Sequence, residues 1–290
     1  MSYRRALQIR PAFEDAYSNL LFVLNYRPDQ RGEEIMAAYR AYDAQFGWPH
    51  IGSLATLPQQ SRYRRRLKVG YVSAALRRHS SRHFLEPLLA RHDHSVVEVY
   101  AYAESSRPDE VTDRYKRYVD HWVPTQDMSD DALAERIRMD NIDILVELAG
   151  HTLGNRLQVF ARKPAPVSLH WLDFGYTTGL SAIDYYLTDW PTVPAGSEAL
   201  FSETPWRLDG PGLVYRPAEG VGEVSPLPAE KKGHLTFGSL TRAVRINHHT
   251  VRVWLSCLNE CPTLAWSSTA ATTALRRCKT NWPIALPNTA

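Results

Sequence analysis

The sequence predicts an α/β protein, in which a Rossmann-like lobe with a parallel sheet follows a stretch of tetratricopeptide-like helices. Three observations lead to this prediction. After about residue 66, short β-branched runs alternate with amphipathic stretches, which is typical of a parallel sheet with helices on both faces. Before residue 47, apolar residues recur at helical spacing instead. The chain has 290 residues, 44% of them hydrophobic and 22% charged, which suits a folded protein of about two modest domains.

Residues 1–48 are predicted to form the helical segment. Pro11 separates two apolar runs with helical spacing, and a third helix is expected from Gly32 to Phe46, before the break at Trp48-Pro49. The spacing resembles the second helix of one tetratricopeptide repeat followed by the first helix of the next. One such unit cannot bury its own apolar face. Either earlier repeats are missing from this chain, or the helices dock on the residues that follow.

A linker is expected at residues 49–66. It leads into the basic run 62–68, which we interpret as a solvated approach to a buried strand, with contact to a polyanion or a partner as the alternative. The whole chain has 34 Lys and Arg against 31 Asp and Glu, a formal net charge of +3. This excess is too small for a chain of this length to predict a dedicated nucleic-acid-binding protein.

Residues 67–232 are predicted to form the Rossmann-like first lobe. In parallel sheets of this kind, ligands bind beyond the carboxyl ends of the strands, so the segments that follow the strands are the candidate site. Three such segments, 73–79, 149–152 and 173–179, contribute His, Thr and Gly. The expected strands are 67–72, 96–102, 142–148 and 167–172, and the expected helices lie near 82–92, 108–118, 129–140 and 155–162.

Several common active-site motifs are absent from the sequence. No Gly-x-Gly-x-x-Gly follows a strand and no Gly-Lys-Ser/Thr loop occurs, which disfavours a nicotinamide dehydrogenase and a P-loop NTPase. The sequence has neither a Gly-x-Ser-x-Gly elbow nor a His-Glu-x-x-His pattern, which disfavours α/β-type serine hydrolases and common metalloproteases. Group transfer and binding are the functions that remain.

The 3 cysteines predict neither a disulfide framework nor a metal centre. Their odd number fits a reducing compartment. Cys257 and Cys261 have a spacing that some zinc sites use, and His248 and His249 lie nearby, but no second pair completes four ligands. The sequence also lacks an apolar segment of signal-peptide length at its start and any run of about 18 apolar residues. We therefore expect a cytoplasmic protein with no metal and no contact with a membrane.

A dense series of motifs extends from about Leu67 to Asn247. It comprises Val69–Ser73 with His79, His83–Pro87, Asp143–Arg156, Phe160–Pro166, Trp171-Leu172, Thr177–Leu180 and Asp184–Asp189. The series closely resembles the catalytic region of the O-linked N-acetylglucosamine transferase family, including its bacterial SPINDLY-like members. The resemblance implies a metal-independent GT-B fold, with two Rossmann-like lobes around a nucleotide sugar. It also implies transfer of the sugar, with inversion and without a cofactor, to a Ser or Thr hydroxyl of a protein. The implied donor is UDP-N-acetylglucosamine, with GDP-fucose as the alternative that SPINDLY relatives suggest.

The same resemblance supplies candidate site residues. A neutral histidine can accept a hydroxyl proton because its free pKa of about 6.5 lies near working pH. A histidine at a strand end is more often a local hydrogen-bonding residue, so a structural role stays open for each one. By resemblance, the catalytic candidates are His79, His151 and Arg245, and the substrate-binding candidates are Thr152, Leu172, Thr177, Thr178, Gly179 and Arg242.

Two positions depart from the pattern of the family. Asp173-Phe174-Gly175-Tyr176 stands where family members often have Gly-Tyr-Pro-Gly, which adds a charge at Asp173. Arg245 stands where the family has a lysine against the leaving diphosphate. A planar guanidinium is no simple replacement for an ammonium group. We expect Arg242, one helical turn away, to share this task.

Residues 233–290 are predicted to be the start of a second lobe that this chain does not complete. From Ser267 onward, the sequence loses hydrophobic periodicity and resembles no family motif. A cleft with one wall would lose most of its stabilisation of the leaving diphosphate. The expectation is therefore a glycosyltransferase of the protein O-GlcNAc transferase type with weak or no turnover. The alternative is a non-catalytic member of that family that binds protein through its helices.

Overall fold

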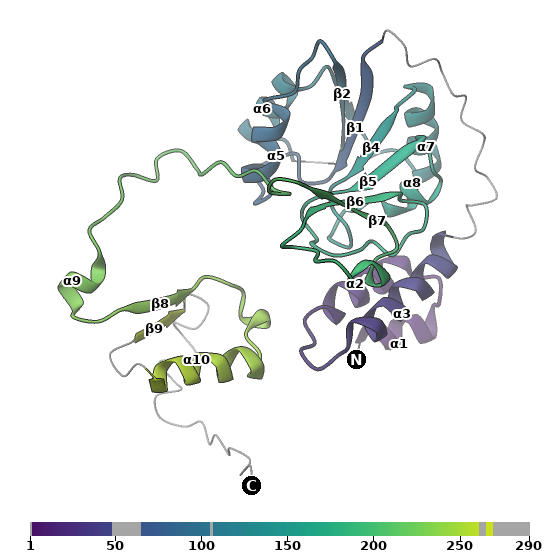
Figure 1. Ribbon diagram of the computed structural model, residues 1–290. Coiled ribbons are helices and arrows are strands. Elements are labelled where there is room, and N and C mark those ends of the chain that lie inside the picture. The colour runs from purple at the N-terminus through teal and green to yellow at the C-terminus, as the bar shows by residue number, and fades with distance from the viewer. Residues whose placement is uncertain (1, 48–64, 105–106, 261–264, 269–290) are drawn as a thin grey trace. The chain divides into compact units, whose positions relative to one another are not determined.

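The computed structural model describes residues 2–47, 65–104, 107–260 and 265–268 (Figure 1). The chain divides into two compact units, Met1–Asn25 with Asp29–Glu219, and Tyr26–Pro28 with Gly220–Ala290. All but two residues of the expected linker, and all but two of those from Ser267 onward, lie outside the described residues. The domain boundaries expected from the sequence stay predictions. Among the helices that the structure describes, none is both long and apolar enough to cross a membrane.

The first unit is built on a seven-stranded sheet in which all neighbouring strands run parallel, in the order β3-β2-β1-β4-β5-β6-β7. The chain moves outward in one direction from β1 and in the other from β4, so the carboxyl ends of these two strands form a topological switch point. The predicted α/β class is confirmed, although β3, β6 and β7 are not among the strands expected from the sequence. The strands are β1 (Leu67–Ser73), β2 (Val97–Ala103), β3 (His121–Pro124), β4 (Ile144–Glu147), β5 (Val167–His170), β6 (Tyr185–Asp189) and β7 (Thr204–Leu208).

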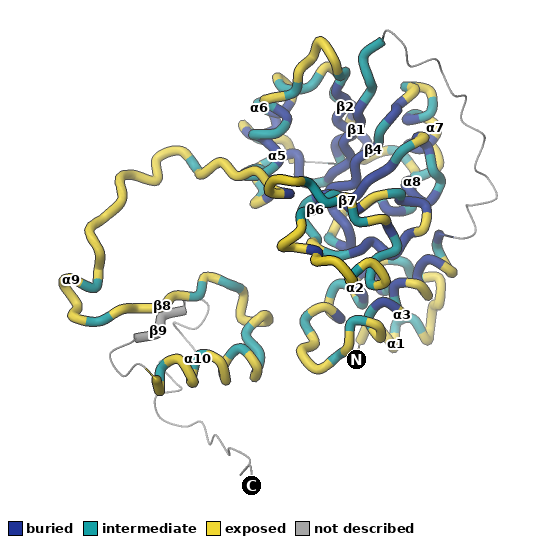
Figure 2. The backbone as a smooth tube through the Cα atoms, viewed as in Figure 1, coloured by how far each residue is buried: buried dark blue, intermediate teal, exposed yellow. Residues whose placement is uncertain are grey.

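Helices cover both faces of this sheet, which gives the unit two cores. Successive side chains of a strand point to opposite faces, so Tyr71 packs with α5 and α6, whereas Val72 packs with α7 and α8. Burial on both faces explains why β1 and β2 are nearly continuous apolar runs. Figure 2 shows the buried backbone concentrated in these strands. The helices are α5 (Arg82–Leu89), α6 (Glu110–Tyr118), α7 (Asp130–Met139) and α8 (Leu157–Ala161), with a 3-10 turn η2 (Glu198–Leu200) before β7.

The amino-terminal helices pack on the face of the sheet that α7 and α8 cover. Leu21 of α2 and Tyr39 of α3 are fully buried, in the same core as Phe160 of α8. The helices therefore dock on the residues that follow, which is one of the two arrangements expected from the sequence. Their relation to tetratricopeptide repeats stays a prediction. This helical segment comprises α1 (Ser2–Ile9), α2 (Glu14–Leu24), α3 (Gly32–Tyr42) and a π-helical turn η1 (Asp43–Gly47).

The second unit contains a small β-α-β element. Its strands β8 and β9 pair in parallel, with Thr236 opposite Ala265, and α10 connects them. Parallel neighbours need such a crossover because a tight turn cannot join them. A Rossmann-like lobe would begin in this way, so the assignment of these residues to a second lobe stays a prediction. The elements are α9 (Pro228–Lys232), β8 (Thr236–Ser239), a 3-10 turn η3 (Ala243–Arg245), α10 (His248–Glu260) and β9 (Ala265–Ser268).

Candidate functional site

A cavity of about 340 Å³ opens at the carboxyl edge of the seven-stranded sheet. Its walls come from the segments that follow β1 and β5, from β6 itself, and from the loop after β7. Doubly wound sheets bind their ligands at this edge, so the cavity is the candidate site. The residues around it include Ser80, Ser81, Leu172, Asp173, Tyr186 and Leu213.

The segment after β5 lines the cavity in a strained conformation. Leu172 and Asp173 have φ angles of 75° and 60°. The left-handed region costs an L-residue roughly 1–2 kcal/mol, and residues held there cluster at functional sites. Trp171 anchors the start of the segment, because its backbone N–H donates to Glu147 O at 2.9 Å and its indole N–H donates to Gly212 O at 2.8 Å. The surroundings thus impose a conformation that the residues themselves disfavour.

His79 and Asp173 meet beside this cavity. Nδ1 of His79 lies 2.8 Å from Oγ of Ser81 and 3.8 Å from Oδ2 of Asp173. The imidazole is 38% exposed, whereas the carboxylate is only 12% exposed, so the ring covers the acid. Burial raises the pKa of Asp173 to about 6, Glu147 adds to this rise, and His170 opposes it. Above that pH, the cavity wall carries a shielded negative charge next to an accessible base.

Below this pair lies a buried ion pair that sequence reasoning missed. Nδ1 of His170 donates to the carboxylate of Glu147 at 2.6 Å, and the same carboxylate accepts the backbone N–H groups of Ala149 and Gly150 at 2.8 and 2.7 Å. Burial lowers the pKa of His170, but the hydrogen bond and charge of Glu147 outweigh it, and the pKa is raised. The signal was present in the sequence, because each residue interrupts an apolar run near its carboxyl end, and the two are register partners of β4 and β5. Among the described residues, Nε2 of His170 has no hydrogen-bond partner.

His151 lies between the lobe and the helical segment. Its Nε2 is 2.7 Å from the carbonyl oxygen of Thr178, and its Nδ1 is 2.8 Å from Oγ of Ser18 in α2. A carbonyl can only accept, so Nε2 carries the proton and Nδ1 accepts the Ser18 hydroxyl. Burial lowers the pKa of His151 to about 4, so the ring is neutral at pH 7. Since both nitrogens serve this junction, the geometry gives His151 a structural role, and its part in proton transfer stays a prediction.

The threonine loop after the cavity wall also faces the helical segment. Both hydroxyls are buried and donate to Glu203, that of Thr177 at 2.5 Å, and the backbone N–H of Thr178 donates to the same carboxylate at 2.8 Å. Gly179 has a φ of 82°, and a Cβ there would lie 3.1 Å from the carbonyl oxygen of Tyr39. The loop is therefore a close joint with α3. Its contact with a sugar donor stays a prediction.

The other candidates are spread over both units. Leu172 lines the cavity, whereas the Thr152 hydroxyl donates to Ala149 O at 2.7 Å within its own turn. Arg242 and Arg245 are exposed residues of the second unit, and they flank η3, where the backbone N–H of Arg245 donates to Arg242 O at 3.0 Å. The structure thus brings His79 and Leu172 to one cavity edge and gathers His151 with the threonine loop at the helical joint.

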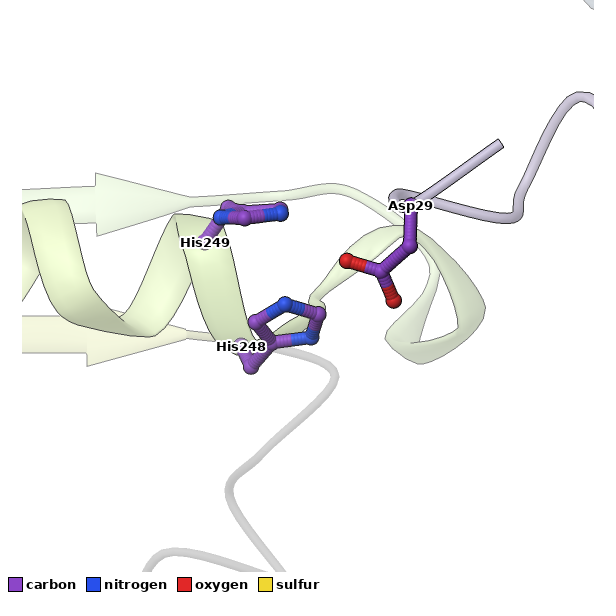
Figure 3. Close-up of side chains that lie close together, drawn as sticks. All are labelled: Asp29, His248 and His249. Atoms are coloured by element: carbon purple, nitrogen blue, oxygen red, sulfur yellow. The ribbon is translucent and has the colours of Figure 1, made fainter. Parts of the chain in front are cut away.

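His248 and His249 begin α10, with ring centroids 4.1 Å apart (Figure 3). Asp29, which Figure 3 also labels, belongs to the first unit. In the described part of the second unit, no third Cys, His, Asp or Glu joins these rings in a group that could hold a metal ion. Cys257 is exposed, and Cys261 and Cys278 lie outside the described residues. The expectation that the chain needs no metal stays a prediction.

The doubly wound sheet and the cavity at its carboxyl edge define a Rossmann-like ligand-binding protein. The sequence profile of Glycosyl transferase family 41 matches residues 51–206, more than half of the chain. The chain belongs to this family. The resemblance to O-linked N-acetylglucosamine transferases found in the sequence is thereby confirmed.

Individual relatives extend this relationship over nearly the whole chain. The probable UDP-N-acetylglucosamine–peptide N-acetylglucosaminyltransferase SPINDLY of Oryza sativa is 33% identical over 271 residues, and the match covers 90% of this chain but 28% of that protein. The UDP-N-acetylglucosamine–peptide N-acetylglucosaminyltransferase of Caenorhabditis elegans is 36% identical over 141 residues, which cover 48% of this chain and 12% of that protein. A solved structure of a Thermobaculum terrenum O-GlcNAc transferase mutant superposes with a TM-score of 0.86 at 32% identity, over 96% of this chain and 53% of that one. The seven-stranded unit is therefore a catalytic lobe of the GT-B type.

Proposed function

We propose that the protein is a glycosyltransferase of the protein O-GlcNAc transferase type, which moves a sugar from a nucleotide donor to a Ser or Thr hydroxyl of a protein. The observation that carries this proposal is the pair His79 and Asp173 beside the cavity of a family 41 lobe. An accessible imidazole there can take the proton of an incoming hydroxyl.

In the proposed reaction, the acceptor oxygen forms a bond to the anomeric carbon while the bond from that carbon to the diphosphate oxygen breaks. Attack from the opposite side inverts the anomeric carbon. The hydroxyl proton passes to His79, and the nucleoside diphosphate leaves with the electron pair. In this proposal, Arg242 and Arg245 neutralise the diphosphate, since guanidinium groups bind phosphate oxygens in pairs.

The donor is proposed to be UDP-N-acetylglucosamine, which the printed names of the relatives specify. GDP-fucose is the second donor to be tested. The acceptor is a protein, and the helical segment is the proposed contact for it. The chain spans 28% of the length of its SPINDLY relative, so these assignments to donor and acceptor describe the proposed activity of the family lobe.

A non-catalytic binding role is the second candidate. One observation favours it, namely that the imidazole of His151 and the hydroxyls of Thr177 and Thr178 hold the helical segment to the lobe. Residues spent in this way build a stable platform without any contribution to transfer.

Isothermal titration of the chain with each donor separates the two candidates. We expect saturable heat with one donor. The variant Leu213→Trp places a large ring at the cavity wall and should weaken donor binding about tenfold or more, since a bulky side chain excludes ligand from a preformed pocket.

Val96→Trp is the matched control, because Val96 is 57% exposed and precedes β2, at the opposite edge of the sheet. It should bind as the parent chain does. Transfer of labelled sugar to a protein acceptor, lost in His79→Gln, then tests the activity itself. Absence of heat with both donors from a folded chain would contradict the transferase and favour the binding role.

A further inference from the structure

Asp173 combines features that a merely structural residue would not need. Its carboxylate is 12% exposed, and it sits at a φ of 60°, directly after Leu172 at 75°. Glycine adopts such angles without strain, and the family motif often has glycine at this place. This chain therefore holds an acid where the backbone favours glycine.

The carboxylate faces one accessible imidazole. Its Oδ2 lies 3.8 Å from Nδ1 of His79, which is beyond hydrogen-bond length, while the Ser81 hydroxyl contacts the same nitrogen at 2.8 Å. Asp173 thus acts on the ring through its charge, and Ser81 fixes the ring by a hydrogen bond. Because solvent is largely excluded from the carboxylate, this charge is screened less than it would be on the surface.

Other charged groups set the state of this carboxylate. From β4, Glu147 disfavours its ionisation, and from β5, His170 favours it. Burial is the largest influence, and it raises the pKa of Asp173 to about 6. The acid is consequently ionised at pH 7.5, when a base at His79 would work.

We propose that Asp173 is a positioning residue, which orients the imidazole of His79 and stabilises the imidazolium that forms as the acceptor hydroxyl loses its proton. This inference rests on the proposed function. It adds to the candidate site an acid whose charge the sequence marked only as a departure from the family.

The test is a proton NMR titration of the histidine rings in the chain without donor, with His79 assigned by the loss of its signal in His79→Gln. Asp173→Asn is the main variant, because asparagine has nearly the same volume and tolerates the left-handed region. We expect His79 to titrate at least about 0.7 pH unit lower in Asp173→Asn, from the Coulomb energy of two charges about 4 Å apart in water. Asp173→Gly relieves the backbone and should show the same shift, which excludes strain as its cause.

Asp120→Asn is the matched control. Asp120 lies 2.8 Å from Nδ1 of His94, so this variant should shift His94 and leave His79 unchanged. An unchanged His79 titration in Asp173→Asn would overturn the positioning role, whether or not the chain transfers sugar. A shifted titration without any transfer would support the role and count against the proposed function. Where transfer is measured, Asp173→Asn should lower kcat about tenfold or more with little change in KM, as expected for a group that acts in the transition state.

Discussion

The chemistry of His151 is decided by its surroundings more than by its residue type. A histidine after a strand of a family 41 lobe suggests a base, yet both of its ring nitrogens are engaged, by Ser18 and by the carbonyl of Thr178. The edges and faces of the Tyr39, Tyr42 and Phe174 rings enclose it. A neutral imidazole suits this enclosure, because a charge there would lose its hydration.

This burial predicts a pH dependence of stability. The folded pKa of His151, about 4, lies below the ordinary value of 6.5, so the neutral form favours folding. The stabilisation is complete above pH 6.5 and is lost as the pH falls toward 4, by up to about 3 kcal/mol. His151→Gln keeps a polar side chain that cannot ionise. Urea unfolding at pH 7, 6, 5 and 4 should show the stability gap between parent and variant shrink over this range. A gap that stays constant would mean that His151 is not buried as a neutral ring.

Single-residue assignments could be predicted from the sequence only in part. The motif around His79 placed it beside the cavity, but the buried pair of Glu147 and His170 was not expected. Each of these residues ends an apolar run, where a polar side chain can equally mark the end of a strand. Only the register of β4 against β5 places the two opposite each other, and register depends on the folded sheet.

The threonine loop shows how an element can serve a joint. Glu203 receives both hydroxyls, and the loop lies close to the backbone of α3 at Gly179. A short loop of small residues permits such an approach, whether its partner is a diphosphate or a helix. The sequence identifies the loop as special without specifying which partner it contacts.

Replacement of Gly179 separates close packing from backbone strain. Gly179 and Gly196 have φ angles of 82° and 87°, but a Cβ meets Tyr39 at the first position and nothing within 4 Å at the second. Both alanine variants bear the cost of the left-handed conformation, and Gly179→Ala should lose about 1–3 kcal/mol more because it also overpacks the joint. Urea unfolding of the two variants measures the difference. Equal losses would show that the loop does not press on α3.

Strands were predicted unevenly for a physical reason. β1, β2, β4 and β5 are buried on both faces and carry continuous apolar runs, which the sequence reveals. β3 is four residues long with an exposed His121, and β7 lies at the opposite edge of the sheet with largely exposed side chains. Edge strands bury less surface, so their sequences need less apolar character and resemble loops.

The first unit joins the helical segment and the lobe through one continuous core. Tyr39 of α3 is fully buried, and its ring meets His151 and Tyr176 of the lobe at centroid distances of 5.4 and 5.3 Å. The helical pattern of the sequence showed which residues are apolar, but no periodicity specifies the surface that they cover. Docking on the lobe therefore became known only from the structure.

A shared core predicts that damage to the helical segment reaches the sheet. Tyr39→Ala should cost about 3–5 kcal/mol, as large aromatic truncations in cores do, whereas Ile9→Ala in α1 should stay within about 0.5 kcal/mol because Ile9 is 73% exposed. Hydrogen exchange read by mass spectrometry locates the effect. If segment and lobe unfold together, Tyr39→Ala accelerates exchange in β4 and β5 as well as in α2 and α3, because global unfolding is what exposes the most protected amides. Acceleration confined to α1–α3 would show that the helical segment opens on its own and that its core with the lobe is not cooperative. Ile9→Ala should leave both regions as in the parent chain, which ties any change in the sheet to the buried tyrosine.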